Sequence, residues 1–487
     1  MNSSQIDYSR KWYVMAAVSM GTLLATIDSS IVNVALPTLV RELNTDFATV
    51  QWVVLAYLLT LATLLLSVGR FADMKGKKPI YAMGFVIFTI GSVLCGLAAN
   101  IYMLIAFRVV QAIGATMILA LGMAIITESF PASERGKALG FTGTMVSIGI
   151  VIGPTIGGII IDVFSWNWIF LVNLPVGILG TLMVIRFVPA VKPEGKQRFD
   201  FLGAVSLFLA LFAFLLALTV GQNIGFTDPR VLVLFGLALI LLSTFVIVET
   251  RTAQPMIDLR LFRNTLFSIN LVTGYLTFVA IAGTIILMPF YLENILGYST
   301  REVGILIAAL PISMGIIAPL AGSMSDRFGT RPISVIGLGI LLFGYIALSS
   351  LTVMTSTLGY VLRFLPIGIG MGVFQSPNNS AIMGEAPRDR LGVVSGILAV
   401  NRSLGQTTGI AILGALWASR AIMYAVPLTV ESATNAPIPS QVAALQDTFI
   451  AMILLISLAF GLAIWALIRD RKIRSSTEKE VTGAALD

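Results

Sequence analysis

Long apolar runs separated by short polar turns occupy most of this chain. One such run, Val231–Val248, contains no charged residue. A helix needs about 20 apolar residues to cross the hydrocarbon core of a bilayer, where every backbone amide must find its hydrogen-bond partner within the chain. Only 11% of the 487 residues are charged, too few to cover the surface of a soluble domain. The sequence therefore predicts an all-α integral membrane protein.

The apolar runs predict 14 membrane-spanning helices in three regions. Hydrophobic residues make up 57% of the chain, which at about 20 per helix fills about 14 helices. We expect an N-terminal six-helix bundle in residues 1–190 and an inserted two-helix hairpin with cytoplasmic linkers in residues 191–264. A C-terminal six-helix bundle is expected in residues 265–470, followed by a disordered cytoplasmic tail in residues 471–487.

Basic residues support this count, because they collect on one side of the predicted membrane. Lys and Arg residues mark the cytoplasmic segments of multi-pass proteins. With both termini in the cytoplasm, few of the 31 Lys and Arg residues fall elsewhere: Arg41, Arg230, Arg301 and Arg420 in outside loops, and Arg108, Arg363 and Arg402 within spans. The net charge of +7 follows from this bias. We therefore expect a protein of the inner or plasma membrane without a nucleic-acid partner.

The residues that are missing exclude several kinds of chemistry. The chain contains no histidine, which excludes Ser-His-Asp catalysis and His-ligated metals. Its single cysteine, Cys95, excludes an intrachain disulfide and a cysteine metal cluster. No phosphate-binding loop is present in the sequence, which argues against ATP-driven pumping. We therefore expect a protein without enzymatic activity, cofactor or metal.

The sequence contains an internal repeat on either side of the inserted hairpin. Three patterns recur at nearly the same offset, about 255 residues, which is hard to obtain by chance. They are Gly69–Pro79 with Gly322–Pro332, Arg108 with Arg363, and Ser147-x-Gly149-x-x-x-Gly153 with Ser403-x-Gly405-x-x-x-Gly409. Parallel repeats of this kind are typical of transporters, whose substrate site lies between the two halves near the midplane.

Five motifs resemble those of the major facilitator superfamily. Gly69–Pro79 resembles its signature loop between helices 2 and 3, and Leu104–Gly114 resembles its helix-4 motif. Gly149–Gly158 resembles the helix-5 motif associated with antiporters. Asp28–Pro37 and Trp166–Pro175 are similar to segments of the 14-helix drug:proton antiporters, the multidrug and quaternary-ammonium exporters. The resemblance implies the major facilitator fold and a monomeric exporter, with a lipophilic small molecule, protons and the lipid bilayer as its partners.

Asp28 and Arg108 are the residues that we expect to couple protons to transport. Asp28 is the only carboxylate deep inside a predicted span, where a charge needs a cavity or a partner. At 1.5 Å per residue both lie about 10–12 Å from the outer ends of their helices, so they can meet if those helices are neighbours, as the resemblance implies. An ion pair whose strength changes between access states would couple protonation to motion. A static pair that only holds the helices together is the alternative.

Polar and soft side chains in other spans are candidates for the substrate path. Gln111, one turn beyond Arg108, could join the same network. Arg363 has no embedded carboxylate in its half, so we expect backbone carbonyls or nearby amides as its partners, and either a contact with substrate or a structural role. The full set is Asn33, Tyr57, Gln111, Tyr275, Met288, Arg363, Gln375, Asn378 and Asn379.

Two groups of residues are expected to gate the path. The acidic residue of each signature loop can cap a helix N-terminus and meet a neighbouring arginine, while the loop glycines permit close backbone approach. Small residues at every fourth position of the fifth span allow close helix contact, and its proline introduces a kink. Tight turns and ordinary packing are the alternatives. The residues are Gly69, Asp73, Gly76, Asp326 and Arg327 in the loops, and Gly149, Gly153, Pro154, Gly157 and Gly158 in the fifth span.

Three functions remain to be weighed. The first is a proton-coupled antiporter that exports lipophilic drugs or toxic compounds by alternating access. A single embedded acid fits a neutral or monocationic substrate better than a dication. The second keeps the fold and exports a lipid, a metabolite or an anionic amphiphile. The third, a membrane enzyme or a non-transporting receptor, is supported by no motif in the sequence.

Overall fold

The computed structural model describes residues 10–484 apart from short gaps at 132–133, 191–199, 253–258, 386–390, 427–429 and residue 431. Within this part the chain is helical and contains no strand. Thirteen helices in it are long and apolar enough to cross a membrane. A further helix of 34 residues, α16, packs among them, so the predicted total of 14 spans stays a prediction.

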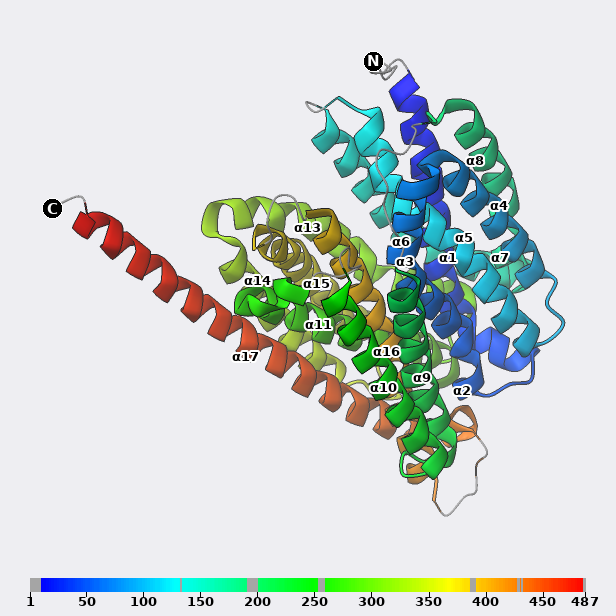
Figure 1. Cartoon of the computed structure of the whole chain (residues 1–487). Coiled ribbons are helices and arrows are strands. Elements are labelled where there is room, and N and C mark those ends of the chain that lie inside the picture. The colour runs from blue at the N-terminus through cyan, green and yellow to red at the C-terminus, as the bar shows by residue number, and fades with distance from the viewer. Residues whose placement is uncertain are drawn as a thin grey trace.

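The first half of the chain forms one bundle, drawn in blue to teal in Figure 1. Polar side chains start some of its helices by accepting hydrogen bonds from free backbone N–H groups, as Asp46 does for Thr49 and Asn100 does for Met103. The bundle consists of α1 (Lys11–Glu42), α2 (Phe47–Val50), α3 (Trp52–Lys75), α4 (Lys77–Gly96), α5 (Ile101–Ser129), α6 (Arg135–Val163), α7 (Trp168–Leu171) and α8 (Asn173–Phe187).

The second half forms the other bundle, after the inserted pair α9 (Phe201–Ile224) and α10 (Pro229–Arg251). The first long helix of this second bundle, α11, continues without a break into a π-helical turn, η3. The remaining helices are η2 (Leu259–Arg263), α11 (Thr265–Phe290), η3 (Tyr291–Ile295), α12 (Thr300–Ile307), α13 (Ala309–Phe328), α14 (Thr330–Leu348), α15 (Thr357–Gly384), α16 (Leu391–Tyr424), η5 (Ala433–Asn435) and α17 (Ile438–Ala484).

The two bundles touch at the ends of their helices that lie away from the N-terminus. We call these ends the outer ends and the opposite ends, at the top of the first bundle in Figure 1, the inner ends. Aromatic rings from α2, α11 and α16 meet there: the ring centroid of Phe47 lies 4.9 Å from that of Phe290 and 4.7 Å from that of Trp417. The Arg41 guanidinium forms an ion pair with the Glu293 carboxylate across the same junction. The two halves are therefore in contact on the outer side.

The inserted hairpin packs over the seam between the two halves. α9 contacts both α3 and α16, and Figure 1 shows α9 and α10 in front of this junction. Leu215 and Leu218 of α9 form a small apolar core with Leu59 of α3 and Ala411 of α16. α9 therefore links the inserted hairpin to both halves of the molecule.

The repeated signature loops fold as matching one-residue turns. Gly76 between α3 and α4 has φ of 97°, and Gly329 between α13 and α14 has φ of 88°, a region that favours glycine. The predicted capping is wrong for Asp326, because α14 begins after Gly329 without a side-chain cap in the described part of the chain, and Asp326 is exposed. Close approach is also wrong for Gly69, since a Cβ there would meet no atom within 4 Å.

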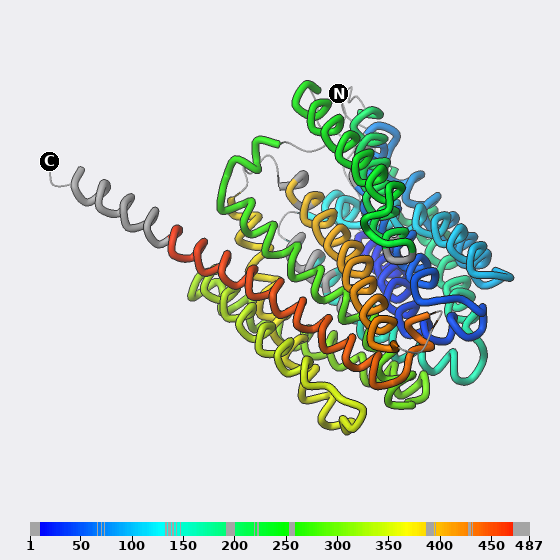
Figure 2. The backbone as a smooth tube through the Cα atoms, turned by 90° about the horizontal axis from the view of Figure 1, so that it is seen from below, coloured from blue at the N-terminus to red at the C-terminus, as the bar shows by residue number. Residues whose placement is uncertain are grey.

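The last helix, α17, crosses the second bundle beside α11, α14 and α16 (Figure 2). It ends at Ala484, so it includes much of the segment in which we expected a disordered tail. The other domain boundaries stay predictions.

Candidate functional site

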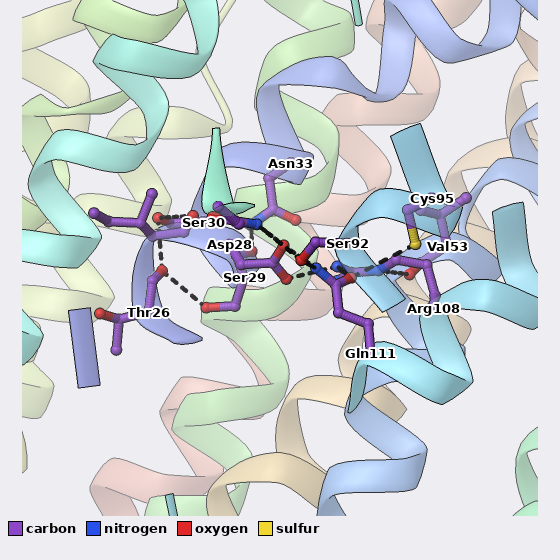
Figure 3. A network of polar contacts seen from close by, with 12 residues as sticks. Thr26, Asp28, Ser29, Ser30, Asn33, Val53, Ser92, Cys95, Arg108 and Gln111 are labelled. Atoms are coloured by element: carbon purple, nitrogen blue, oxygen red, sulfur yellow. Dashed lines mark hydrogen bonds and ion pairs between the residues drawn. The ribbon is translucent and has the colours of Figure 1, made fainter. Parts of the chain in front are cut away.

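A buried ion pair lies in the middle of the first bundle. Asp28 of α1 is 0% exposed and Arg108 of α5 is 1% exposed, so neither charge reaches solvent in this arrangement. The Arg108 Nη1 donates to Asp28 Oδ2 at 2.6 Å (Figure 3). A pair with one partner missing would leave an uncompensated charge, which is strongly unfavourable in such surroundings. The contact expected from matched helix depth is thus present.

Gln111 joins the two charges and extends the network to α4. Its side-chain oxygen accepts a hydrogen bond from Arg108 Nη1 at 2.6 Å. Its side-chain nitrogen donates to Asp28 Oδ1 at 2.7 Å and to Ser92 Oγ at 2.7 Å. Because Gln111 lies one helical turn after Arg108, both side chains leave the same face of α5 and point toward α1. Gln111 therefore orients both members of the ion pair.

A fourth helix completes the shell around the carboxylate. The Asn173 side chain, at the start of α8, donates to Asp28 Oδ1 at 3.1 Å and lies 3.4 Å from Ser92 Oγ. Asp28 thus accepts hydrogen bonds from an arginine and two amides, which offset the cost of removing its charge from water. The network joins α1, α4, α5 and α8 through buried side chains.

The guanidinium of Arg108 has its own support from α3. Arg108 Nε donates to the backbone oxygen of Val53 at 3.1 Å. The Tyr57 ring centroid lies 4.2 Å from the guanidinium carbon and that of Phe170 lies 5.7 Å away, both within cation–π range. Arg108 therefore stays solvated by protein if its carboxylate partner is neutralised. Protonation of Asp28 would weaken the ion pair that joins α1 to α5, while Arg108 would keep its contacts with Val53, Tyr57 and Phe170.

Glycines of α6 bring that helix directly onto the segment of α1 that carries Asp28. A Cβ at Gly149 would overlap Thr26, and a Cβ at Gly153 would overlap Ser30. The Ser30 hydroxyl also donates to the Gly149 backbone oxygen at 3.2 Å. The predicted close helix contact at these positions is therefore seen.

Further along α6, the next two glycines, Gly157 and Gly158, contact α1 and the second bundle. A Cβ at Gly157 would still meet α1, whereas one at Gly158 would meet the Thr300 backbone oxygen at the start of α12. A Cβ at Gly304 of α12 would in turn overlap the backbone oxygen of Pro154. The fifth span thus packs on α1 with one face and on the second bundle with another.

Comparison with known proteins places the chain in one family. The model of the Major Facilitator Superfamily matches residues 18–410. The chain belongs to the major facilitator superfamily. Riboflavin transporter RibZ of Clostridioides difficile is 34% identical over 84% of this chain and 89% of its own length. Multidrug resistance protein Stp of Mycobacterium tuberculosis is 33% identical over 83% of this chain and 75% of its own length.

A solved structure supports the fold. A bacterial homologue of the human lysosomal transporter Spinster, in an inward-facing and unoccupied conformation, superposes with a TM-score of 0.68. It is 19% identical and covers 94% of this chain and 97% of its own. The protein is therefore a multi-pass membrane transporter with the major facilitator fold.

Two of the other predicted path residues of this transporter join the network, and the rest do not. Tyr57 and Gln111 lie at the ion pair, as described. Asn33 donates to the Ser29 backbone oxygen at 3.2 Å within α1, and Met288 is buried in the second bundle. Asn378 is buried and donates to the Asn270 backbone oxygen at 3.2 Å. Side chains that are half-buried, away from the network, are Tyr275, Gln375 and Asn379.

Arg363 lies at the outer end of α15 rather than deep in the bundle. It is in the second turn of that helix, and its side chain donates to Ser350 Oγ and to the Gly359 backbone oxygen, each at 2.9 Å. The backbone carbonyl that we expected as one possible partner is therefore present, whereas the amides Gln375 and Asn378 lie three or more turns further along the helix. The structure therefore does not bring Arg363 to the site of Asp28.

The predicted gating residues of the loops are only partly described. The side chain of Asp73 lies outside the described residues. Asp326 and Arg327 are exposed at the inner end of α13. Ion pairs of the second loop are instead made by Arg331, which binds Glu385 Oε1 at 2.5 Å and also pairs with Asp470. In the first loop, Lys77 binds Glu128 Oε1 at 2.6 Å.

The sequence also missed three polar residues that matter here. Asn173 lies in the Trp166–Pro175 motif, which was the available signal, whereas Ser92 lies in an apolar run with none. Glu293 contradicts the expectation that the second half has no buried carboxylate, because its side chain is only 8% exposed. The π-helical turn η3 extends α11 to Ile295 and holds Glu293 in the helix end.

Proposed function

We propose that this transporter is a proton-coupled antiporter that exports lipophilic, neutral or monocationic compounds by alternating access. The buried pair of Asp28 and Arg108 is the observation that carries the proposal. An intramembrane ion pair with a carboxylate and a full set of hydrogen-bond donors is the kind of group that marks proton relays in transporters. Relatives named for multidrug resistance, such as Stp, support the substrate class. The basic bias of the inner segments supports cytoplasmic termini.

The chemistry assigned to Asp28 is uptake and release of one proton. When Asp28 is ionised it holds α5 through Arg108 and α8 through Asn173. When it is protonated it loses its charge, so the tie to Arg108 weakens while Arg108 keeps its contacts with α3. In this arrangement Asp28 is 0% exposed, so proton exchange requires another arrangement of the helices. A cycle that alternates between the two arrangements couples proton movement to substrate movement in the opposite direction.

The proposal is tested with purified protein in proteoliposomes under an imposed pH gradient. The probe is tetraphenylphosphonium, a lipophilic monocation, with Asp28→Asn compared against Glu128→Gln. Glu128 pairs with Lys77 at the inner end of α5, far from the network, and serves as the matched control. We expect gradient-driven transport to be lost in Asp28→Asn and retained in Glu128→Gln. Full gradient-driven transport in a folded Asp28→Asn variant would refute the role of Asp28.

A polar metabolite is the second candidate substrate, and two observations favour it. RibZ, named as a riboflavin transporter, is 34% identical to this chain. In the second bundle, amides of three helices lie together: Asn378 donates to Asn270, and Asn401 donates to the Leu271 backbone oxygen at 3.1 Å. The side-chain nitrogen of Asn270 is buried without a hydrogen-bond partner in the described part of the chain. Uncharged amides with a free donor suit a polar, neutral ligand.

Competition separates the two substrate classes. In the same proteoliposomes, riboflavin should leave tetraphenylphosphonium transport unchanged if lipophilic compounds are the substrates. If riboflavin is itself transported and Asn270→Ala abolishes its transport, the metabolite reading replaces the first. Both substrate classes would use the same protonation of Asp28. The experiment therefore identifies the substrate and does not test the coupling of protons to transport.

A further inference from the structure

A cavity of about 270 Å³ opens at the inner end of the first bundle. It is formed by the inner ends of α1, α4 and α5 and by the chain that leaves α8. Its lining residues include four bases and a hydroxyl: Arg10, Lys11, Lys78, Arg186 and Ser129. Among the described residues that line it, none is acidic. The cavity therefore concentrates positive charge in a recess rather than on an open surface.

Most of this positive charge is not neutralised by the described part of the protein. Lys11 Nζ binds Glu134 Oε2 at 2.6 Å, and Glu134 is part-exposed. Within the described residues, Arg10, Lys78 and Arg186 form no ion pair. Ser129 is among the lining residues, and its hydroxyl is buried without a hydrogen-bond partner in the described part of the chain. A buried polar group without a partner is unusual and indicates that a ligand can complete the site.

The matching corner of the second bundle shows what the first one lacks. Arg331 occupies the position of Lys78 in the repeated signature loop. It pairs with Glu385 at the end of α15 and with Asp470 of α17, the last helix of its half. In the first bundle the last helix presents Arg186 at its inner end instead of an acid. Arg331 is thus neutralised by two carboxylates, whereas Lys78 and Arg186 form no ion pair in the described part of the chain.

Aromatic residues beside the cavity place it at the level of lipid headgroups. Trp12 and Tyr13 follow Lys11 on α1 and are 51% and 55% exposed. The Tyr13 ring stacks on Phe187 with centroids 4.6 Å apart, next to Arg186. Exposed tryptophan and tyrosine gather where the hydrocarbon core meets the headgroups, and basic pockets between helices at that level bind anionic headgroups. A free phosphate compound would not need the flanking aromatic surface.

We propose that this cavity binds the phosphate of an anionic phospholipid, with Lys78 and Arg186 on its oxygens and the Ser129 hydroxyl as a further donor. The four helices that reach the cavity are also those that carry Asp28, Ser92, Arg108 and Asn173. A lipid bound there would tie their inner ends together and stabilise the bundle in which the ion pair lies. The site is separate from the proposed transport path.

The test uses delipidated full-length protein and three probes: phosphatidylglycerol, phosphatidylcholine and inorganic phosphate. Native mass spectrometry measures retained lipid, and thermal denaturation measures stabilisation. The pocket variant is Lys78→Gln/Arg186→Gln. The control is Arg251→Gln/Arg263→Gln, which removes the same charge from exposed inner positions outside the cavity. We expect phosphatidylglycerol to bind about 30-fold more weakly to the pocket variant than to the control, because two basic contacts are lost.

Each outcome has a defined meaning. Phosphatidylcholine should bind weakly to all three proteins, because its headgroup carries no net charge. Equal binding of phosphatidylglycerol to the pocket variant and the control would overturn the proposal. Stabilisation by inorganic phosphate that displaces phosphatidylglycerol would overturn the lipid assignment and identify a soluble phosphate compound. If the double variant does not fold, Ser129→Ala removes the donor without changing charge, and unaltered phosphatidylglycerol affinity there would equally refute the site.

Discussion

The ion pair between Arg41 and Glu293 offers a test of what holds the outer ends together. Arg41 ends α1 in the first bundle and Glu293 ends α11 in the second. One carboxylate oxygen of Glu293 pairs with Arg41, and the other is buried without a hydrogen-bond partner in the described residues. Replacing Glu293 with Gln removes the charge and keeps the shape. We expect Glu293→Gln to shift the transporter toward arrangements in which the outer ends separate.

The size of this shift follows from the exposure of the two partners. The Glu293 side chain is 8% exposed, whereas that of Arg41 is 53% exposed. Exposed pairs contribute about 0.2–1 kcal/mol and the loss of one partner of a buried pair costs about 3–5 kcal/mol. The free energy of the Arg41–Glu293 pair should lie between these two ranges, because water screens Arg41 but not Glu293. We expect about 1–2 kcal/mol, which is about a 5- to 30-fold change in the ratio of closed to open outer ends.

Distances between spin labels on the two outer ends measure this ratio. Labels at Glu42→Cys and Leu358→Cys lie on exposed positions of opposite halves, and the native Cys95 is fully buried. Glu293→Gln should add a population with longer distances in double electron–electron resonance. Arg41→Gln should add the same population, and the two changes together should add no more, because they remove a single contact.

Two results would refute the reasoning on the outer ion pair. An unchanged distance distribution in Glu293→Gln would show that apolar contacts alone keep the outer ends closed. Additive effects of the two substitutions would show that each residue acts through a different partner. Glu302→Gln is the control, because Glu302 is an exposed outer acid that only caps α12 with Ser299.

Three other predictions concern the network and its packing. Gly153→Val should lower the thermal denaturation temperature and abolish transport because of overlap with α1, whereas Gly69→Ala should be tolerated since no atom lies near it. Asn173→Ala should lower the free energy of unfolding by about 1–3 kcal/mol, seen as a lower thermal denaturation temperature, because it removes a donor to the buried Asp28 carboxylate. The double variant Asp28→Asn/Arg108→Gln should be more stable than Arg108→Gln alone but remain uncoupled in proteoliposomes, because it restores neutrality without a titrating group.

Much of the fold could be predicted because the bilayer leaves few choices. Only helices and closed barrels satisfy the backbone in hydrocarbon, and continuous apolar runs of about 20 residues have the length that a helix needs. The repeat then predicted two bundles of one design, and the matching positive φ angles of Gly76 and Gly329 show that the repeated loops share a conformation. What the sequence could not give was the exact point at which helices begin and end. Glu293 was misjudged for that reason, because η3 extends α11 to Ile295.

The candidate site was predictable only where charge was involved. A charge in a membrane span is costly, so Asp28 and Arg108 had to find each other or a cavity. Ser92 and Asn173 are neutral, and neutral polar residues in a span can face lipid headgroups, another helix or their own backbone. Helix depth does not say which face a residue occupies. Their hydrogen bonds to the network became visible only once α4 and α8 were packed against α1.

The contact pattern of α6 explains how a change at Asp28 could reach the junction of the two halves. α1 carries Asp28 and packs directly on Gly153, which has no side chain that could adjust when α1 moves. One residue further, the Pro154 backbone oxygen touches Gly304 of α12 in the second bundle. At Gly153 the α6 backbone lies against the Ser30 side chain and the Ile27 backbone oxygen of α1, and at Pro154 it lies against the Gly304 backbone. Contacts this close leave little free space, so a displacement of α1 is passed on to α6. The ion pair of Asp28 and Arg108 lies within the first bundle. We infer that α6 transmits a displacement of α1 caused by protonation of Asp28 to the second bundle.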